Sequence, residues 1–254
     1  MNAPIGLTDN TFKDEVMKAR QSAVSKAGND WENYVENFLR ESLKEIESKF
    51  KEYKTYIEDI NIQRMGKKSE IESIKKNYPL LYQSLFIPII NFGKDRELLL
   101  KNTEIIDEIF STGVVGDTDI VIFSKNYQIP VLIVSCKVSL HGRLTESLFY
   151  SLYYKITNKI KFVLATPDKG KQAKEKWETE WGMPEKPSKD RMLATLFLDG
   201  IYVDNVPNFM PPSFNPERDK TALGGIVRPL VELPYDIIRW YEDIKFMKNN
   251  GKNG

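Results

Sequence analysis

The sequence has very little cysteine or histidine: a single residue of each, Cys136 and His141, in 254 residues. One cysteine excludes an intramolecular disulfide and a zinc site built from several cysteines. One histidine argues against zinc hydrolases that bind the metal through several imidazoles, and against nucleophile systems that need a spare histidine partner. Any chemistry must therefore depend on carboxylates, lysines and hard metal ions.

An excess of one charge and long apolar runs are also missing. The 37 Lys and Arg residues nearly balance 36 Asp and Glu residues, for a net charge of +1, so nucleic-acid binding would need local clusters of basic residues. No apolar run approaches the roughly 18 residues that cross a bilayer, and the first residues do not look like a signal peptide. With 41% hydrophobic residues, we expect a soluble cytoplasmic protein with a real core and no membrane contact.

The N-terminal part, about residues 10–80, is expected to be mainly helical. Apolar residues recur at helical spacing between charged ones over residues 10–60. Residues 28–30 interrupt this pattern, and Asp30 is expected to be the N-cap of a second helix. A turn at residues 66–69 should precede another short helix, and residues 85–92, which contain a proline, are ambiguous.

From residue 113 the sequence favours an α/β core. Residues 119–123 and 129–134 are short β-prone runs separated by a turn-like stretch, which predicts two neighbouring strands. An amphipathic helix of about four turns follows, with its apolar stripe expected on one face. The residues of that stripe are Leu144, Leu148, Leu152 and Ile156.

Further elements are expected after this helix. They are a strand at residues 160–165, a charged helix at about 169–181, a hairpin centred on residues 199–200 and a final helix at 235–248. We expect one domain over residues 1–247, with its core at about 100–205. The tail, residues 248–254, should be disordered.

An acidic residue and a lysine lie at the ends of the first two predicted core strands. Asp119 opens one strand, and Lys137 ends the next, which is otherwise apolar. Stranding a charge in the core costs several kcal/mol, so Lys137 must find a partner or solvent. If the strands pair antiparallel, both residues lie at the open end of the hairpin. Taken singly, Asp119 and Asp117 are explained by a turn, and Lys137 by a solvated strand end.

This pattern resembles the PD-(D/E)xK nuclease superfamily, and within it type II restriction endonucleases. There, an aspartate before a hydrophobic strand is combined with a strand that ends in Glu-x-Lys or Asp-x-Lys. Asp119 matches the aspartate, and Ser135-Cys136-Lys137 matches the second part, with serine at the acidic position and Thr118 at the proline. Ser-x-Lys is similar to the variant in restriction enzymes that cleave CCGG-containing sites, where the following helix supplies the missing carboxylate.

Two further stretches carry the resemblance. The segment from Ser139 through His141 to Arg143 looks like the start of the DNA-reading helix of that group, with His141 in place of the first arginine. Near the N-terminus, Trp31-Glu32 resembles a family helix in which a glutamate follows an aromatic residue and joins the active site. The resemblance therefore implies DNA contacts by the first segment and a catalytic role for Glu32.

The resemblance implies a restriction-endonuclease-like fold: a mixed central sheet flanked by helices, with extra N-terminal helices. It also implies Mg²⁺-dependent cleavage of double-stranded DNA. Asp119, the backbone carbonyl of Cys136 and Glu146 would bind the metal, while Lys137 would orient or deprotonate the attacking water. For the acid missing at position 135, we rank Glu146 ahead of Glu32.

A symmetric DNA site implies a homodimer, here in a prokaryotic cytoplasm. Lys189 and Arg191, in a basic run, either contact phosphates or belong to a solvated loop. Two alternatives remain open: another DNA-processing nuclease of this fold, or an inactive DNA-binding or interaction module. Carboxylates converging near Lys137 would favour an enzyme, and scattered ones would favour a module.

Overall fold

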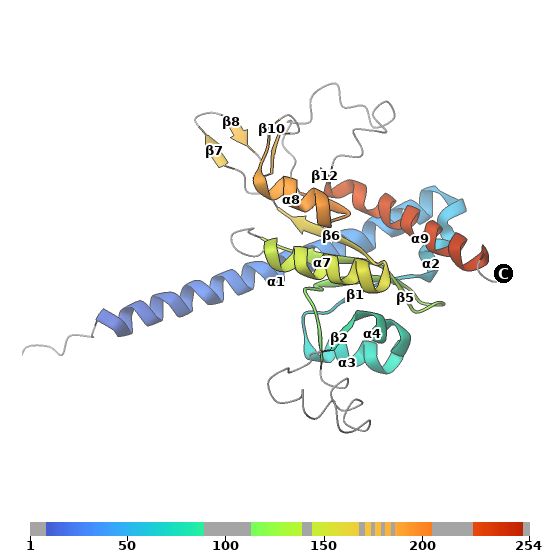
Figure 1. Ribbon diagram of the computed structural model, residues 1–254, viewed down its shortest axis with the longest axis horizontal. Helices are drawn as coiled ribbons and strands as arrows, with labels where there is room; N and C mark the ends of the chain where they lie inside the picture. Colours follow the sequence, from blue (N-terminus) through green and yellow to red (C-terminus); the bar gives the residue numbers. More distant parts are fainter. Residues whose placement is uncertain are drawn as a thin grey trace, which may run out of the picture.

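A six-stranded mixed sheet with helices on both faces forms the centre of the molecule (Figure 1). The computed structural model describes residues 9–88, 113–138, 144–167, 171–173, 176–178, 181–183, 186–204 and 226–250. Residues 205–225 and residues 251–254 of the expected tail lie outside them. The α/β class expected from the sequence is confirmed.

The strands of the central sheet follow the order β1-β4-β5-β6-β11-β12. They are β1 (Ile60–Arg64), β4 (Ile120–Ser124), β5 (Ile129–Cys136), β6 (Lys161–Thr166), β11 (Gly200–Val203) and β12 (Val227–Pro229). The strands β1, β4 and β5 pair antiparallel, whereas β5, β6, β11 and β12 pair parallel. The expected β4–β5 hairpin and the strand after it are therefore confirmed.

Short two-stranded pairings lie outside this sheet. They are β2 (Phe86–Pro88) with β3 (Gly113–Val115), β7 (Lys171–Ala173) with β8 (Lys176–Glu178), and β9 (Gly182–Met183) with β10 (Lys186–Pro187). The charged helix expected at residues 169–181 is wrong wherever the structure describes this stretch. A run of charged residues is compatible with a hairpin as well as with a helix, so composition alone does not separate the two.

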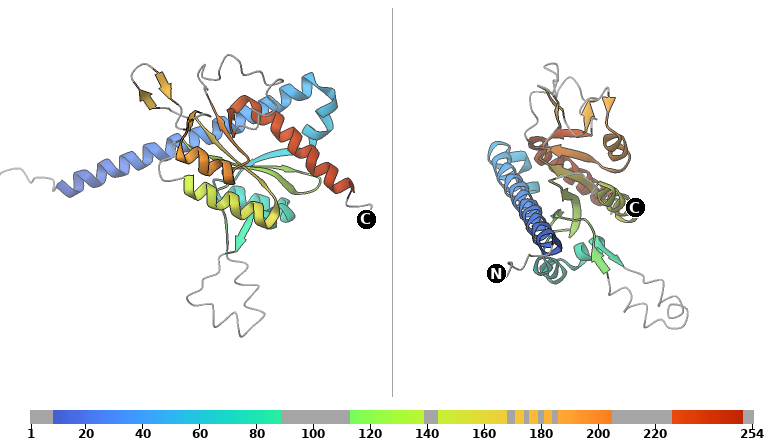
Figure 2. Two further views of the ribbon diagram at one scale, coloured as in Figure 1. Left: turned by 45° about the horizontal axis from the view of Figure 1, so that its top comes forward. Right: turned by 90° about the vertical axis from the view of Figure 1, so that its left-hand side faces the viewer.

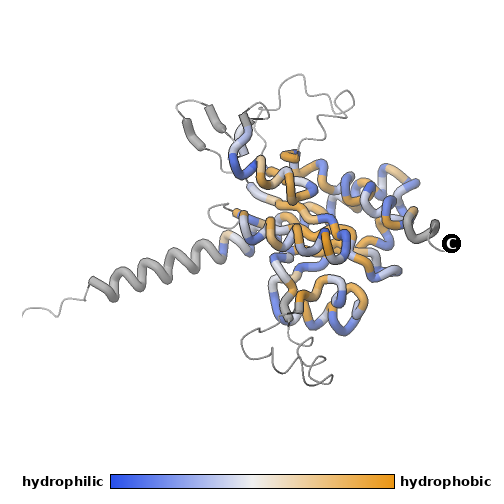
Figure 3. The backbone as a smooth tube through the Cα atoms, viewed as in Figure 1, coloured by the Kyte–Doolittle hydropathy of each residue, from blue (hydrophilic) through white to orange (hydrophobic). Residues whose placement is uncertain are grey.

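Helices cover both faces because side chains alternate along the strands. Ile120 and Ile122 of β4 pack towards α1, α2 and α9, whereas Val121 and Phe123 pack towards α3, α4, α7 and α8. Figure 2 shows α1 and α7 on opposite sides of the sheet, and Figure 3 shows apolar residues concentrated along its central strands. The first group of helices is α1 (Asp9–Lys49), α2 (Lys54–Asp59) and α9 (Leu233–Asn250). The second is α3 (Lys68–Asn77), α4 (Pro79–Leu85), α7 (Leu144–Asn158) and α8 (Lys189–Phe197), and the short 3-10 turns are η1 (Lys51–Tyr53) and η3 (Leu230–Glu232).

The N-terminal part differs from expectation in two ways. The helix α1 runs without a break through Gly28 and Asp30, so Asp30 is not an N-cap. A glycine inside a helix costs only about 1 kcal/mol, and burial of Trp31 and Val35 in the core holds this stretch helical. In addition, β1 is a strand at Ile60–Arg64, because its alternate residues are buried against β4.

The hairpin expected around Asp199 is also wrong. The residues before it form α8, capped by Ser188, whose hydroxyl accepts a hydrogen bond from the Arg191 amide. The strand after it, β11, pairs parallel with β6. The Asp199 carboxylate instead accepts from the Phe162 amide at 3.0 Å and pairs with Lys161 at 3.1 Å, so it ties the turn to the start of β6.

The helix α7 buries a different face from the one that its apolar stripe predicts. Leu144 and Leu148 are buried, but Leu152 is 41% exposed and Ile156 73% exposed. The buried face instead carries polar residues: Ser147, Ser151 and Tyr154. Each makes a hydrogen bond to another element, which stabilises it in the core. Hydrophobic periodicity cannot detect such anchors, because it counts only apolar residues.

None of the helices in the described part of the chain combines the length and the apolar character that crossing a bilayer requires.

Candidate active site

The β4–β5 hairpin brings the predicted aspartate and lysine together. In its register Ile120 lies opposite Val134, so the residues just before β4 and just after β5 meet at the open end. Lys137 Nζ forms ion pairs with the carboxylates of Asp117 and Asp119, the latter at 3.2 Å. Asp119 and Lys137 therefore lie together at the open end of the hairpin, as the sequence predicted.

This cluster is largely withdrawn from solvent. The side chains of Lys137 and Asp117 are 8% and 7% exposed, and that of Asp119 is 19% exposed. Burying charges costs several kcal/mol unless they are paired, so these three residues depend on one another. The remaining exposure of Asp119 leaves it the most accessible of the three.

Backbone groups hold Asp119 in place. The amide of Cys136 donates to Asp119 Oδ2 at 2.6 Å, and the Met65 amide donates to the Asp119 carbonyl at 3.0 Å. Burial raises the pKa of Asp119 to about 6, with further raising by the charges of Asp117 and Glu32; Lys137 and the Cys136 amide act in the opposite direction. Burial is thus the main reason why Asp119 holds its proton more tightly than an exposed aspartate does.

Asp117 is the site residue that the sequence analysis missed. Its Oδ2 accepts hydrogen bonds from Ser135 Oγ at 2.8 Å and from Ser147 Oγ at 2.7 Å. The serine at the family's acidic position thus binds a carboxylate that arrives from the turn before β4. A turn alone is enough to explain an aspartate at position 117. The only feature of the sequence that could have marked Asp117 as a site residue was its two-residue spacing from Asp119.

Lys137 is stabilised in its charged form. Burial on its own lowers the pKa of the ammonium group, but the charges of Asp119 and Asp117 and hydrogen bonds to both outweigh it, so the pKa is raised. Lys137 therefore carries its proton at neutral pH and offers a positive charge and N–H donors. The Cys136 thiol is buried, and burial raises its pKa well above the ordinary value, so it is an inert core group.

Glu32 comes to the same region from α1. The preceding residue, Trp31, donates its indole N–H to the Ala165 carbonyl at 3.1 Å, and the same carbonyl accepts from the Lys137 amide at 2.9 Å. Glu32 itself pairs with Arg64 at 2.7 Å. Its charge is the smallest of the causes that raise the pKa of Asp119, and among the described residues Glu32 makes no hydrogen bond or ion pair with Asp119 or Lys137.

Glu146, the other candidate acid, has no contact with the cluster. It is an exposed residue in the first turn of α7, while its neighbour Ser147 faces Asp117. Within the described residues it makes no hydrogen bond or ion pair with Asp119 or Lys137. The ranking of Glu146 ahead of Glu32 therefore has no support in this geometry, because the buried face of α7 differs from the predicted one.

The expected DNA-contacting residues fall into two groups. Ser139, His141 and Arg143 lie outside the described residues. Lys189 is exposed at the start of α8, and Arg191 donates from its guanidinium group to the Gly182 carbonyl at 3.0 Å. Neither is bonded to the Asp117–Lys137–Asp119 cluster, so any role in DNA contact would be separate from it.

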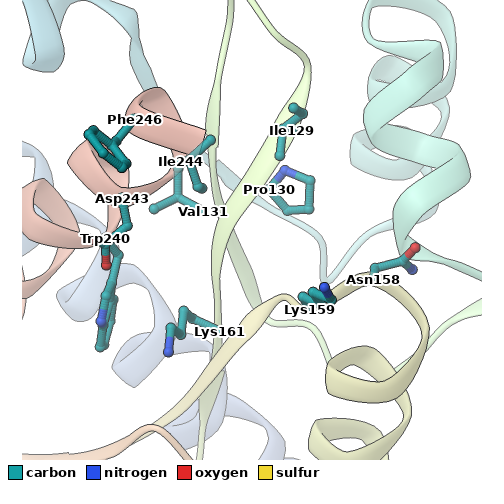
Figure 4. Close-up of a pocket in the computed structure, with 10 residues that line it drawn as sticks. All are labelled: Ile129, Pro130, Val131, Asn158, Lys159, Lys161, Trp240, Asp243, Ile244 and Phe246. Atoms are coloured by element: carbon teal, nitrogen blue, oxygen red, sulfur yellow. The ribbon is translucent and has the colours of Figure 1, made fainter. Parts of the chain in front are cut away.

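A pocket of about 570 Å³ lies at the opposite end of β5 (Figure 4). Ile129, Pro130 and Val131 form one wall, and Trp240 and Phe246 of α9 contribute to the other. Lys137 lies at the other end of the same strand. This pocket is therefore distinct from the candidate active site.

The site suits a hard divalent cation in its donor chemistry. Carboxylate oxygens are the ligands that Mg²⁺ prefers, and Asp117 and Asp119 share one ammonium group. Burial is the largest cause of the raised pKa of Asp119, followed among the raising causes by the charge of Asp117, and a bound cation would favour the ionised carboxylate. In the part of the chain that the structure describes, no three acidic, histidine or cysteine residues converge as a ready-made metal cluster. A cation would therefore bind mainly through the two aspartates.

These features define a class of protein: a mixed α/β protein with a restriction-endonuclease-like fold, N-terminal helices and a buried Asp–Lys site. Residues 100–217 match a family model described as BsaWI restriction endonuclease type 2. The matched segment contains Asp117, Asp119, Ser135 and Lys137, whereas Glu32 lies outside it. The match supports a type II restriction endonuclease, a nuclease family that acts on DNA and generally depends on divalent metal ions. No curated protein sequence matches the chain.

Proposed function

We propose that this protein is a Mg²⁺-dependent, site-specific endonuclease that cuts double-stranded DNA to leave 5′-phosphate and 3′-hydroxyl ends. One observation carries the proposal. Two aspartates, largely withdrawn from solvent, pair with a buried lysine at the open end of the β4–β5 hairpin, within the segment that matches the restriction endonuclease family. Burying these charges costs free energy, and an inactive binding module would gain no catalytic function that offsets this cost.

Asp119 and Asp117 would hold the cation, with the backbone carbonyl of Cys136 as a further candidate ligand. A bound divalent ion supplies positive charge at the phosphate and makes water easier to deprotonate. Because the pKa of Asp119 is about 6 without a cation, its carboxylate is mostly ionised above that pH. We therefore expect metal binding to strengthen as the pH rises through this value.

Lys137 would act on the phosphate. Its raised pKa keeps the ammonium group protonated at neutral pH, so it serves as a donor to the developing negative charge and orients water, rather than removing a proton. The general base that accepts the proton of the attacking water would have to come from elsewhere, such as a phosphate oxygen or the Glu32 carboxylate. The sequence left two roles open for Lys137, orienting the attacking water or deprotonating it, and the raised pKa favours the first.

DNA recognition would depend on residues other than the Asp117–Lys137–Asp119 cluster. Ser139, His141 and Arg143 follow Lys137 directly in the chain, and we assign them to the DNA contact. Lys189 is exposed and suits a phosphate contact, whereas the guanidinium of Arg191 is already bonded to Gly182. Each chain has one such site, so cutting both strands of a symmetric sequence favours a homodimer.

We also propose that residues 1–247 act as one domain in the cytoplasm of a prokaryote. The support is the shared core: α1 and α9 pack on the same face of the sheet. Through this packing the Glu32 side chain would reach the active site.

Plasmid digestion tests the proposal directly. Incubation with Mg²⁺ should yield discrete fragments with the same mapped ends in every molecule, and excess EDTA should abolish them. Mn²⁺ should also support cleavage, whereas Ca²⁺, with its looser coordination, should support binding more than cutting. Discrete cleavage in excess EDTA, or none in either Mg²⁺ or Mn²⁺ over many plasmid sequences, would refute the proposed function.

A further inference from the structure

One face of α7 contacts the short turn that carries Asp117. Ser147 Oγ donates to Asp117 Oδ2 at 2.7 Å, and the Gly116 amide donates to the Tyr154 hydroxyl at 3.1 Å. A Cβ on Gly116 would clash with the Tyr150 ring, at 2.6 Å from Cε1, so this close approach requires a glycine. Residues 147, 150 and 154 lie on the same face of the helix, and α7 therefore holds the turn at two consecutive residues.

Asp117 in turn restrains Lys137. Its Oδ1 accepts a hydrogen bond from the Lys137 ammonium, and its Oδ2 accepts from the hydroxyls of Ser135 and Ser147. Ser135 belongs to the same strand end as Lys137, whereas Ser147 is the only partner of Asp117, among the described residues, that comes from outside the β4–β5 hairpin. Both serines are fully buried, so the loss of either hydroxyl would leave the carboxylate one hydrogen bond short.

We propose that Ser147 is a positioning residue that acts through Asp117 and orients Lys137 towards the phosphate. This inference rests on the proposed function, in which the Lys137 ammonium meets the developing negative charge. A lysine carries its charge on a flexible four-carbon stem, and electrostatic stabilisation requires a donor that is already in place before the reaction. By holding Oδ2 of Asp117, Ser147 fixes the direction in which Oδ1 restrains the ammonium.

This role differs from the one that the family resemblance implies for the helix after Lys137. The resemblance implies a carboxylate from that helix, but the acid there, Glu146, is exposed and makes no hydrogen bond or ion pair with Lys137 among the described residues. The next residue, Ser147, instead donates a neutral hydroxyl to a carboxylate that the hairpin already carries. The helix α7 thus contributes orientation to the active site rather than charge.

A purely structural role would be to fasten α7 to a neighbouring element, and Ser151 already performs it. Ser151 lies about one helical turn after Ser147, is equally buried, and donates to the Phe197 carbonyl at 2.5 Å. It makes no hydrogen bond with Asp117 or Lys137 among the described residues. Ser151→Ala is therefore the matched control for Ser147→Ala, because each substitution removes one buried hydroxyl from the same face of α7.

Single-turnover plasmid cleavage in Mg²⁺ and DNA binding in Ca²⁺, both with the full-length protein, separate the two roles. Ser147→Ala should lower the cleavage rate constant about tenfold or more, while the Kd for the same DNA changes less than about twofold. Ser151→Ala should leave both values near wild type at temperatures where it is folded, even if its melting temperature falls as far. Equal cleavage rate constants for the two variants would overturn the inference. If Ser147→Ala does not fold, Ser147→Cys, which keeps the side-chain volume but only a weak donor, takes its place.

The Lys137 ammonium gives a second readout that needs neither metal nor DNA. In ¹H–¹⁵N NMR spectra of the metal-free protein, its signal is identified by its absence from Lys137→Ala. Exchange of its hydrogens with water should be several-fold faster in Ser147→Ala, because Asp117 restrains the ammonium less firmly, and unchanged in Ser151→Ala. Unchanged exchange in Ser147→Ala, or an ammonium that exchanges too fast to be observed in wild type, would contradict the positioning role.

Combining the substitutions shows whether Ser147 acts through Asp117. The double variant Asp117→Asn/Ser147→Ala should cleave no more slowly than Asp117→Asn alone, because the serine would have no other route to Lys137. A further loss in the double variant would overturn the inference. Absence of Mg²⁺-dependent cleavage in wild type would instead overturn the proposed function, and the exchange of the Lys137 ammonium would still decide whether Ser147 positions it.

Discussion

The two ends of the β4–β5 hairpin each hold a buried aspartate, and the two sites differ in kind. At the turn end, Asp59 accepts hydrogen bonds from the Ser124 hydroxyl, from the Asn126 amide at 2.8 Å and from the Tyr241 hydroxyl at 2.6 Å. At the open end, Asp119 shares Lys137 with Asp117 and has a pKa raised to about 6 by burial and neighbouring carboxylates.

The difference between the two aspartates indicates a structural role for Asp59 and a functional role for Asp119. Neutral donors from β4, the turn and α9 satisfy Asp59, so its contacts stabilise the fold. Asp119 lies beside like charges in a place where protonation would be easier, which is a cost to the folded state. Such a cost is typical of sites prepared for a ligand that is bound later. Four predictions test this comparison.

Removing the open-end charges should have the largest effect. Lys137→Ala and Asp119→Ala should each reduce plasmid cleavage by about three orders of magnitude or more, because they remove groups proposed to act on the phosphate and the cation. Circular dichroism and gel-shift assays in Ca²⁺ should show a retained fold and retained DNA binding. Cleavage by Lys137→Ala at a rate close to wild type would show that the open end is not the active site.

The second prediction concerns which acid serves beside Asp119. Asp117→Asn should lower cleavage about 100-fold, because it removes a charge held by Ser135 and Ser147 at the cluster. Glu146→Gln is the control and should change cleavage less than about twofold, since Glu146 is exposed and makes no hydrogen bond or ion pair with Lys137 among the described residues. A large loss of cleavage in Glu146→Gln and a small one in Asp117→Asn would instead identify Glu146 as the second acid. Initial rates on supercoiled plasmid are sufficient to decide.

At the turn end the effect should be on stability alone. Asp59→Asn should lower the free energy of unfolding by about 2 kcal/mol, because the new amide places a donor among donors and leaves buried groups unpaired. Urea unfolding measures the change. Cleavage should stay near the wild-type rate at temperatures where the variant is folded. If Asp59→Asn lost cleavage without losing stability, the turn end would also have a functional role, and the proposed difference between the two ends would be wrong.

The smallest expected effect is a pH dependence at the open end. Asp119 has a folded-state pKa of about 6, above its ordinary 3.8, so the unfolded chain releases this proton first. Without divalent ions, wild-type stability should therefore fall as the pH rises from about 4 to about 6, by roughly 1–2 kcal/mol after allowance for solvent screening. Asp119→Asn should lack this component. Urea unfolding of both proteins at several pH values checks it, and a constant difference between them would contradict it.

The sequence by itself determined the centre of the site. Asp119 and Lys137 belong to one hairpin with a short turn, so β-propensity and the two-residue period place them together without knowledge of the rest of the chain. The α/β class, the strand β6 and the final helix α9 follow from local patterns of the same kind. The lack of further histidine or cysteine narrowed the chemistry to carboxylates and lysine before any contact was known.

Tertiary structure decided the rest, because the remaining partners lie far apart in the chain. Asp117 gains its role from Ser147, thirty residues away on α7, and the polar anchors of α7 turn Glu146 outward. Glu32 and Arg64 meet only because α1 packs against β1. The parallel pairing of β6 with β11 likewise depends on α8 crossing between them. Periodicity reports which face of one element is apolar; it carries no information about which polar groups on different elements will satisfy one another.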